Sequence, residues 1–192
     1  PFVRDDRATT ERALAAALDE ADVVVTVGGV SVGDHDLVRP ALEAVGVDLD
    51  FWRVAIKPGK PLAVGRLARG SGRRDAIVLG LPGNPSSAMV TFALFGVPLL
   101  RALQGDLCPV APARRARLTR AHAQRPGRLS FLRGTLSQGP DGGLWVTPLL
   151  NQSSGAVTSM ALADALVRIP ADSTGAPEGA EVDVLLFDDL GA

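Results

Sequence analysis

The sequence has little of several residue types, and each shortage excludes a class of protein. Its one cysteine, Cys108, allows no internal disulfide, which is typical of a reducing compartment. Its two histidines, His35 and His122, lie far apart with no metal-ligand spacing around them. The net charge of −1 gives no electrostatic case for a nucleic-acid partner.

Long hydrophobic runs are also missing. The longest, residues 93–100, is interrupted by Gly96 and Pro98, so we expect no membrane-spanning helix and no membrane partner. Hydrophobic residues make up 46% of the 192 residues and charged residues 21%, which is typical of a soluble globular protein with a real core. The sequence therefore predicts a cytoplasmic protein.

Lysine is scarce as well, because only Lys57 and Lys60 accompany eighteen arginines. Both lie in the segment IKPGKPLAVG, residues 56–65, where Pro58, Gly59 and Pro61 stiffen the turn. Lysine is a compact point charge that suits a phosphate or a small oxyanion, whereas arginine presents a wide planar fork. Two solvated lysines placed by chance are the alternative. The stiff turn favours an anion site into which both ammonium groups point.

The first half of the chain predicts an α/β fold. Residues 9–21 and a segment starting at Asp36 have helical patterns, and residues 22–27, 51–56 and 76–81 are short apolar strands. The β-branched run 22–27 has no polar alternation, so we expect it to be buried on both faces. A long apolar helix follows LPGNPSS and is expected to break near Pro98. This alternation predicts a doubly wound parallel sheet.

Two glycine-rich or proline-rich turns, VGGVSVGDHD and LPGNPSS, each follow a strand and lead into a helix. In open parallel sheets, ligands bind beyond the carboxyl ends of the strands. A lone glycine pair would be interpreted as a tight turn. Two such turns with the KPGKP segment instead favour an anion pocket, in which glycines allow the backbone to approach the ligand closely.

The composition changes between residues 104 and 117, where prolines and then arginines predict a linker. Beyond it, short β runs cover residues 114–121, 130–137, 144–150, 165–170 and 181–187, separated by turn-forming residues. We therefore predict two domains. An α/β domain covers residues 1–107, and a small all-β domain, a sandwich or barrel, covers residues 108–192.

Acidic residues near the first glycine turn and near the start of the chain have two interpretations. Asp36 and the pair Asp5 and Asp6 suit helix capping, which suffices to explain them. They also suit Mg²⁺, which takes few carboxylates and completes its shell with phosphate and water. The residues alone leave these two alternatives evenly balanced.

Three long segments carry a resemblance to a known family. TVGGVSVGDHD, FWRVAIKPGKPLAVG and LGLPGNPSSAMVTF, with FLRGTL and NQSSGAVTSMALADALVRIP further on, are similar to the molybdopterin molybdotransferase family, the MoeA type that also forms the E domain of gephyrin. The resemblance covers essentially the whole chain, but family members are much longer. It implies a MogA-like molybdopterin-binding domain whose N-terminal part is missing, followed by the family's C-terminal β domain. Ser86 departs from the family, which usually has valine there.

The resemblance also implies an activity in molybdenum cofactor synthesis. Family members insert molybdate into adenylylated molybdopterin and release AMP, with a dependence on a divalent metal such as Mg²⁺. It further implies a homodimer and a possible encounter with the molybdopterin adenylyltransferase. Two alternatives stay open: a non-catalytic module that binds a pterin or a partner, and a phosphate-ester enzyme on a similar sheet.

The expected site combines residues from both domains. By resemblance, Asp36 and Asp5 handle the adenylylated pterin and its metal, while Lys57, Lys60 and Pro61 form the oxyanion side. Arg133, with Ser153 or Ser154, closes over molybdate. The turns provide the remaining substrate-binding residues: Gly28, Gly29, Ser31, Gly33, Gly83, Asn84 and Ser87.

Overall fold

The computed structural model describes residues 3, 6–30, 37–70, 72–140 and 142–191. The chain forms two compact units. The first consists of Pro1–Val54 with Gly59–Asn84, and the second of Ala55–Pro58 with Pro85–Ala192. The domain boundary after residue 107 was predicted from the change in composition, and it stays a prediction. The helical segment from Pro85 onward belongs to the second unit, together with the β strands.

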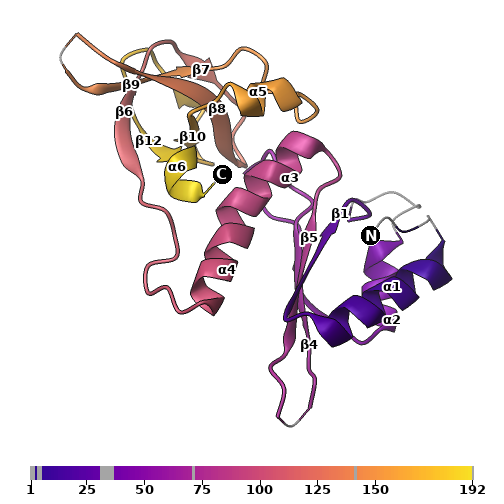
Figure 1. Ribbon diagram of the computed structural model, residues 1–192. Coiled ribbons are helices and arrows are strands. Elements are labelled where there is room, and N and C mark those ends of the chain that lie inside the picture. Colours follow the sequence, from indigo (N-terminus) through magenta and orange to yellow (C-terminus); the bar gives the residue numbers. More distant parts are fainter. Residues whose placement is uncertain (1–2, 4–5, 31–36, 71, 141, 192) are drawn as a thin grey trace. The chain divides into compact units, whose positions relative to one another are not determined.

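The first unit is a four-stranded sheet with two helices (Figure 1). The elements are α1 (Arg7–Glu20), β1 (Val23–Val27), α2 (Val38–Ala44), β2 (Asp48–Trp52), β4 (Ala63–Leu67) and β5 (Ala76–Leu81). The strand order is β1-β5-β4-β2. Only β1 and β5 pair in parallel, while β4 pairs antiparallel with both β5 and β2. The sheet is therefore mixed, and the prediction of a parallel sheet holds for one pair of strands.

The core of the first unit lies between the sheet and its two helices. Asp6 caps α1 by accepting a hydrogen bond from the Thr9 amide at 2.8 Å, so α1 begins at Arg7. The expectation that residues 22–27 are buried on both faces is wrong, because Val25 is 39% exposed and Val27 65%. The core is formed by one face of the sheet and the helices: Leu14, Leu18, Val24, Ala41, Leu42, Val47, Ala76 and Val78.

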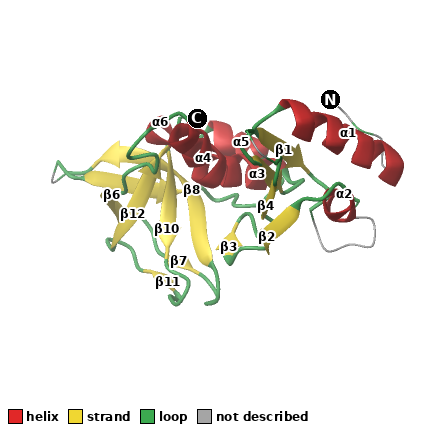
Figure 2. Ribbon diagram, turned by 90° about the horizontal axis from the view of Figure 1, so that it is seen from below, coloured by secondary structure: helices red, strands yellow, loops and turns green. Residues whose placement is uncertain are grey.

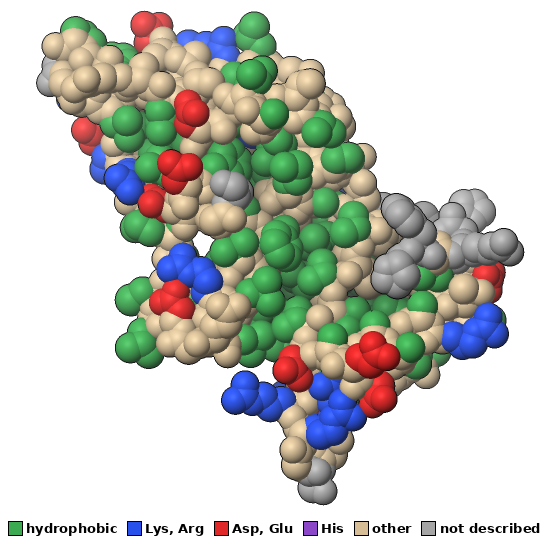
Figure 3. Space-filling view, in the orientation of Figure 1, with side chains coloured by type: hydrophobic (Ala, Val, Ile, Leu, Met, Phe, Trp, Pro, Cys, Tyr) green, Lys and Arg blue, Asp and Glu red, His purple; other side chains and the backbone are tan. Residues whose placement is uncertain are grey.

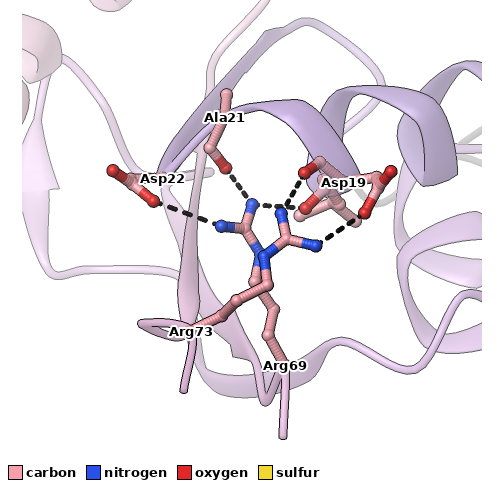
Figure 4. Close-up of polar contacts among 6 residues, drawn as sticks. Asp19, Ala21, Asp22, Arg69 and Arg73 are labelled. Carbon is pink, nitrogen blue, oxygen red and sulfur yellow. Dashed lines mark hydrogen bonds and ion pairs between the residues drawn. The ribbon is translucent and has the colours of Figure 1, made fainter. Parts of the chain in front are cut away.

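Two arginines tie the β4–β5 hairpin to the end of α1 (Figure 4). The Arg69 side chain, 6% exposed, donates from Nη2 to the backbone oxygens of Leu18 and Ala21 and from Nη1 to Asp22 at 3.2 Å. Arg73 donates to the carboxylate of Asp19 at 2.8 Å and to its carbonyl oxygen. These cations satisfy carbonyls that the helix leaves unpaired and complement the negative end of its dipole.

The second unit contains a closed β-barrel (Figure 2). Its principal strands are β6 (Arg114–Leu118), β8 (Leu129–Gln138), β9 (Leu144–Pro148), β10 (Ala165–Ile169) and β12 (Glu181–Leu186). The order β10-β12-β6-β9-β8 closes on itself because β8 also pairs with β10. Each of the five β runs expected from the sequence overlaps one of these strands, and β8 extends one residue beyond its run at both ends. β3 (Ile56–Lys57) joins the outside of β8 in parallel.

The barrel interior follows the two-residue period of its strands. Residues that point inward alternate along each strand. They are Ala116, Leu118, Leu132, Val146, Ala165, Val167, Ile169, Val182 and Val184. Short elements complete the unit: β7 (His122–Ala123), α5 (Val157–Ala161), β11 (Gly175–Ala176) and α6 (Phe187–Leu190).

The long apolar helix of the second unit consists of three segments. α3 (Pro85–Thr91) continues through a π-helical stretch, η1 (Phe92–Gly96), into α4 (Val97–Leu103). The predicted break near Pro98 therefore appears as a change of helical pitch, since proline cannot donate the usual backbone bond. By length and composition Pro85–Leu103 could cross a membrane, a test that core helices of soluble proteins also pass. Hydrophobic side chains are visible at the surface over α3 and α4 (Figure 3).

Candidate functional site

The turns that follow β1 and β5 lie next to each other in the first unit. The amide of Gly28 donates to the Leu81 carbonyl at 3.0 Å, and a Cβ added to Gly83 would lie 3.4 Å from the Gly28 Cα. Gly28 and Gly29 have φ of 86° and 65°, in the left-handed region that favours glycine. A Cβ on Gly29 would lie 2.3 Å from Cγ2 of Val38. The structure thus brings together the ends of two parallel strands, where the sequence predicts a ligand.

Several predicted site residues of these turns lie outside the described residues. They are Asp5, Ser31, Gly33 and Asp36. In the described part of the second turn, Gly83 and Asn84 are exposed. Ser87 is buried at the start of α3. The helix terminus there has fewer free donors than expected, because the Ser86 amide donates to the Ser154 carbonyl and Pro85 has no amide hydrogen.

The two lysines are exposed and belong to different units. Lys57 ends β3 and is paired with Ser130 of β8, in the second unit. Lys60 lies in the first unit, where its carbonyl oxygen accepts from the Val54 amide at 3.0 Å. Pro61 follows it and is half-buried. The predicted convergence of the two ammonium groups in one site stays a prediction.

The charge of Lys57 affects His122, a residue with no metal-ligand spacing in the sequence to mark it as functional. The pKa of His122 is lowered, first by burial and then by the positive charge of Lys57. A cation disfavours protonation of a neighbouring imidazole. Both causes make protonation of His122 less favourable than that of a free imidazole.

Arg133 is the most unusual predicted residue in the structure. It lies on β8 opposite Leu166, whereas its neighbours Leu132 and Gly134 pair with the inward-facing Val167 and Ala165. Because side chains alternate along a strand, Arg133 points to the outer face of the barrel. Its exposed fraction is nevertheless 0%, since the loop that follows β9 covers it.

Among the residues that the structure describes, backbone carbonyls and no carboxylate hold the guanidinium of Arg133. Nη2 donates to the carbonyl oxygens of Asn151 at 3.2 Å and Ser153 at 3.1 Å. Nε and Nη1 are buried and have no hydrogen-bond partner within the described residues. Burial lowers the pKa of Arg133, as expected where water is withdrawn from a cation. Two unpaired buried donors on a charged group are what an oxyanion would satisfy.

The other predicted residues of this loop lie beside Arg133 or hold the loop in place. Ser153 is exposed, and its hydroxyl accepts weakly from the Gly155 amide at 3.4 Å. The Ser154 carbonyl accepts from Ser86 at 3.2 Å, and the Ser86 hydroxyl donates to the Ala156 carbonyl at 2.9 Å. The start of α3 thus fastens the loop that carries both serines. Arg133, Ser153 and Ser154 are brought together in the second unit.

Two family models match the chain. A probable molybdopterin binding domain matches residues 1–102, and the MoeA C-terminal region (domain IV) matches residues 115–187. The chain belongs to the MoeA family of molybdopterin-binding proteins. This finding confirms the resemblance that the sequence segments carried. The two MoeA regions correspond to a MogA-like domain and the C-terminal β domain.

Relatives of known name agree with the MoeA assignment. Over 131 residues, 68% of this chain and 31% of the relative, the chain is 44% identical to the molybdopterin molybdenumtransferase of Haemophilus influenzae. The Bacillus subtilis protein of the same name is 32% identical over 96% of this chain and 41% of its own length. A solved molybdopterin biosynthesis MoeA protein from Pyrococcus horikosii superposes with a TM-score of 0.73 at 34% identity, over 96% of this chain and 42% of that one. The chain spans less than half the length of these relatives.

Proposed function

We propose that the protein containing this chain inserts molybdate into adenylylated molybdopterin and releases AMP. Its relatives are named molybdopterin molybdenumtransferases, which supports an enzyme of molybdenum cofactor synthesis. The observation that carries the proposal is the guanidinium of Arg133, which is fully buried and leaves Nε and Nη1 unpaired. An anion that reaches a buried cation is screened less by water than at a solvated one, and the unpaired donors can replace part of its hydration.

In the proposed mechanism the second unit provides the charge that receives molybdate. Arg133 neutralises the oxyanion, and the hydroxyls of Ser153 and Ser154 complete its hydrogen bonds. Lys57 and Lys60 supply further positive charge as molybdate approaches the dithiolene. In the first unit, Gly28 and Gly83 let the two turns approach each other closely, and Gly29 makes room for Val38. We assign the pterin phosphate to the backbone of these turns.

The proposal keeps Mg²⁺ at Asp5 and Asp36, on the strength of the family resemblance. Bound there, the metal would neutralise the phosphoanhydride that is cleaved when AMP leaves. Among the described residues no group of three or more histidine, cysteine or acidic side chains is suited to hold a metal ion.

The proposal also includes the setting of the enzyme. We place it in the cytoplasm as a homodimer that meets the molybdopterin adenylyltransferase, with no membrane or nucleic-acid partner. The scarcity of cysteine supports the cytoplasm, and the net charge of −1 supports the absence of a nucleic-acid partner. The homodimer and the adenylyltransferase follow from the family resemblance.

A molybdate titration of the full-length protein tests the proposal. We expect AMP release from adenylylated molybdopterin to saturate with molybdate, and Lys60→Gln to raise the molybdate concentration needed, because one of the exposed cations is lost. The control is Arg66→Gln, which removes an exposed cation from β4. A protein that binds the pterin but never releases AMP would instead be a binding module.

A further inference from the structure

Beyond the end of β9, the side chain of Gln152 makes hydrogen bonds to the backbone of Arg133 like those of a neighbouring strand. Its Oε1 accepts from the Arg133 amide at 3.0 Å, and its Nε2 donates to the Arg133 carbonyl at 2.8 Å. Nε2 also donates to the Leu149 carbonyl at 2.8 Å. The Leu149 amide donates to the same Arg133 carbonyl, and β9 ends at Pro148. One amide side chain thus extends the strand pairing by a residue.

These bonds couple the backbone of Arg133 to the loop that covers its guanidinium. The loop carbonyls that hold Nη2 come from Asn151 and Ser153, the residues on either side of Gln152. If Gln152 were released, both carbonyls would be free to move away from the guanidinium. The direction of the unpaired Nε and Nη1 therefore depends on Gln152, although Gln152 itself carries no charge.

We infer that Gln152 is the positioning residue of the oxyanion site, holding Arg133 and its covering loop in the geometry that receives molybdate. This inference rests on the proposed function and deepens it. A neutral amide suits the role because it supplies both a donor and an acceptor. A carboxylate at the same place would lose the two donated bonds and would add a negative charge that competes with the oxyanion for Arg133.

Two variants of the full-length protein separate positioning from folding. Gln152→Glu keeps the acceptor and the size of the side chain, and Gln152→Met removes all three hydrogen bonds at similar length. Gln124 is the matched control, since its Nε2 also donates to two backbone carbonyls, those of Pro170 and Ser173 at 2.8 and 3.2 Å. Gln124→Glu and Gln124→Met therefore remove similar side-chain hydrogen bonds in the same unit. Gln124 makes no hydrogen bond to Arg133.

The decisive readout is the KM for molybdate against kcat, together with the melting temperature. We expect both Gln152 variants to raise KM about tenfold or more, with Gln152→Glu the more affected, and to change kcat at saturating molybdate less than about twofold. The Gln124 variants should lower the melting temperature by a similar amount and leave KM unchanged. An unchanged KM in folded Gln152 variants, or an equal rise in the Gln124 variants, overturns the inference. A wild-type protein whose AMP release does not respond to molybdate overturns the proposed function itself.

Discussion

Replacing Arg133 by methionine should remove anion binding at little cost to stability. The two Nη2 hydrogen bonds to loop carbonyls stabilise the folded state by about 1.5–3 kcal/mol each. The buried, unpaired Nε and Nη1 offset this by about 1–3 kcal/mol each. Asn151 and Ser153 are exposed, so water can bind the carbonyls that the variant releases. The midpoints of these two ranges nearly cancel, so we expect the free energy of unfolding to change by about 2 kcal/mol or less, in either direction.

Unfolding measured with and without the oxyanion separates the effect of Arg133→Met on anion binding from its effect on stability. Tungstate or molybdate at 100 times its Kd should stabilise the wild-type protein by about 2.7 kcal/mol. For a chain of this size that corresponds to a rise in melting temperature of about 5–11 °C. Arg133→Met should show no such rise. Differential scanning calorimetry with and without the oxyanion measures both quantities on the same samples.

A control on the same barrel makes this result specific. Arg115 on β6 is exposed and forms ion pairs with Asp183 at 2.8 Å and Glu181 at 3.3 Å. Arg115→Met should keep the full stabilisation by tungstate. Two results would refute the reasoning: a loss of more than about 3 kcal/mol in Arg133→Met, which is typical of a structural buried charge, or an undiminished response to tungstate in that variant.

Two further predictions concern the first unit. Hydrogen bonding from Thr9 holds the pKa of Asp6 below its ordinary value of 3.8, so the stability contributed by this cap is present above that value and is lost as the pH falls through the lower folded pKa. The deficit in melting temperature of Asp6→Ala should therefore shrink between about pH 5 and about pH 3; a deficit independent of pH would contradict it. Arg69→Met should lower the unfolding free energy by about 2 kcal/mol, because the helix end loses buried bonds. Chemical denaturation of the exposed Arg73→Met should show a smaller loss; equal losses would argue against the role of burial.

The barrel was more predictable than the mixed sheet because its strands have a clear alternating pattern in the sequence. Residues 115–118 and 181–184 alternate between outward charged and inward apolar side chains, a pattern typical of a strand. β4 lacks such a pattern, since Gly65 stands in its centre. That glycine is required because a Cβ there would lie 2.7 Å from the Asp48 carbonyl on β2. The sequence pattern therefore did not reveal β4, the strand that makes the sheet mixed.

The sequence predicted which segments contribute to the candidate site, but it did not predict how their side chains are arranged. Family resemblance selected Arg133, Ser153 and Ser154, and the structure brings these three together. The burial of Arg133 had a local signal, since it interrupts the apolar run of β8. Gln152 had none, because a glutamine in a loop is ordinarily a solvated residue. Its role depends on the end of β9, which only the folded chain defines.

Arg133 differs in its partners from several exposed arginines of the chain. Arg39, Arg101 and Arg114 are each paired with a carboxylate, at 2.9, 2.7 and 2.9 Å, so each presents a neutralised charge to solvent. Arg133 is held instead by two neutral carbonyls, and no carboxylate contacts it within the described part of the chain. Its positive charge is therefore uncompensated and sits where the dielectric constant is low. A protein of net charge −1 can in this way attract a dianion at one place without attracting polyanions over its whole surface.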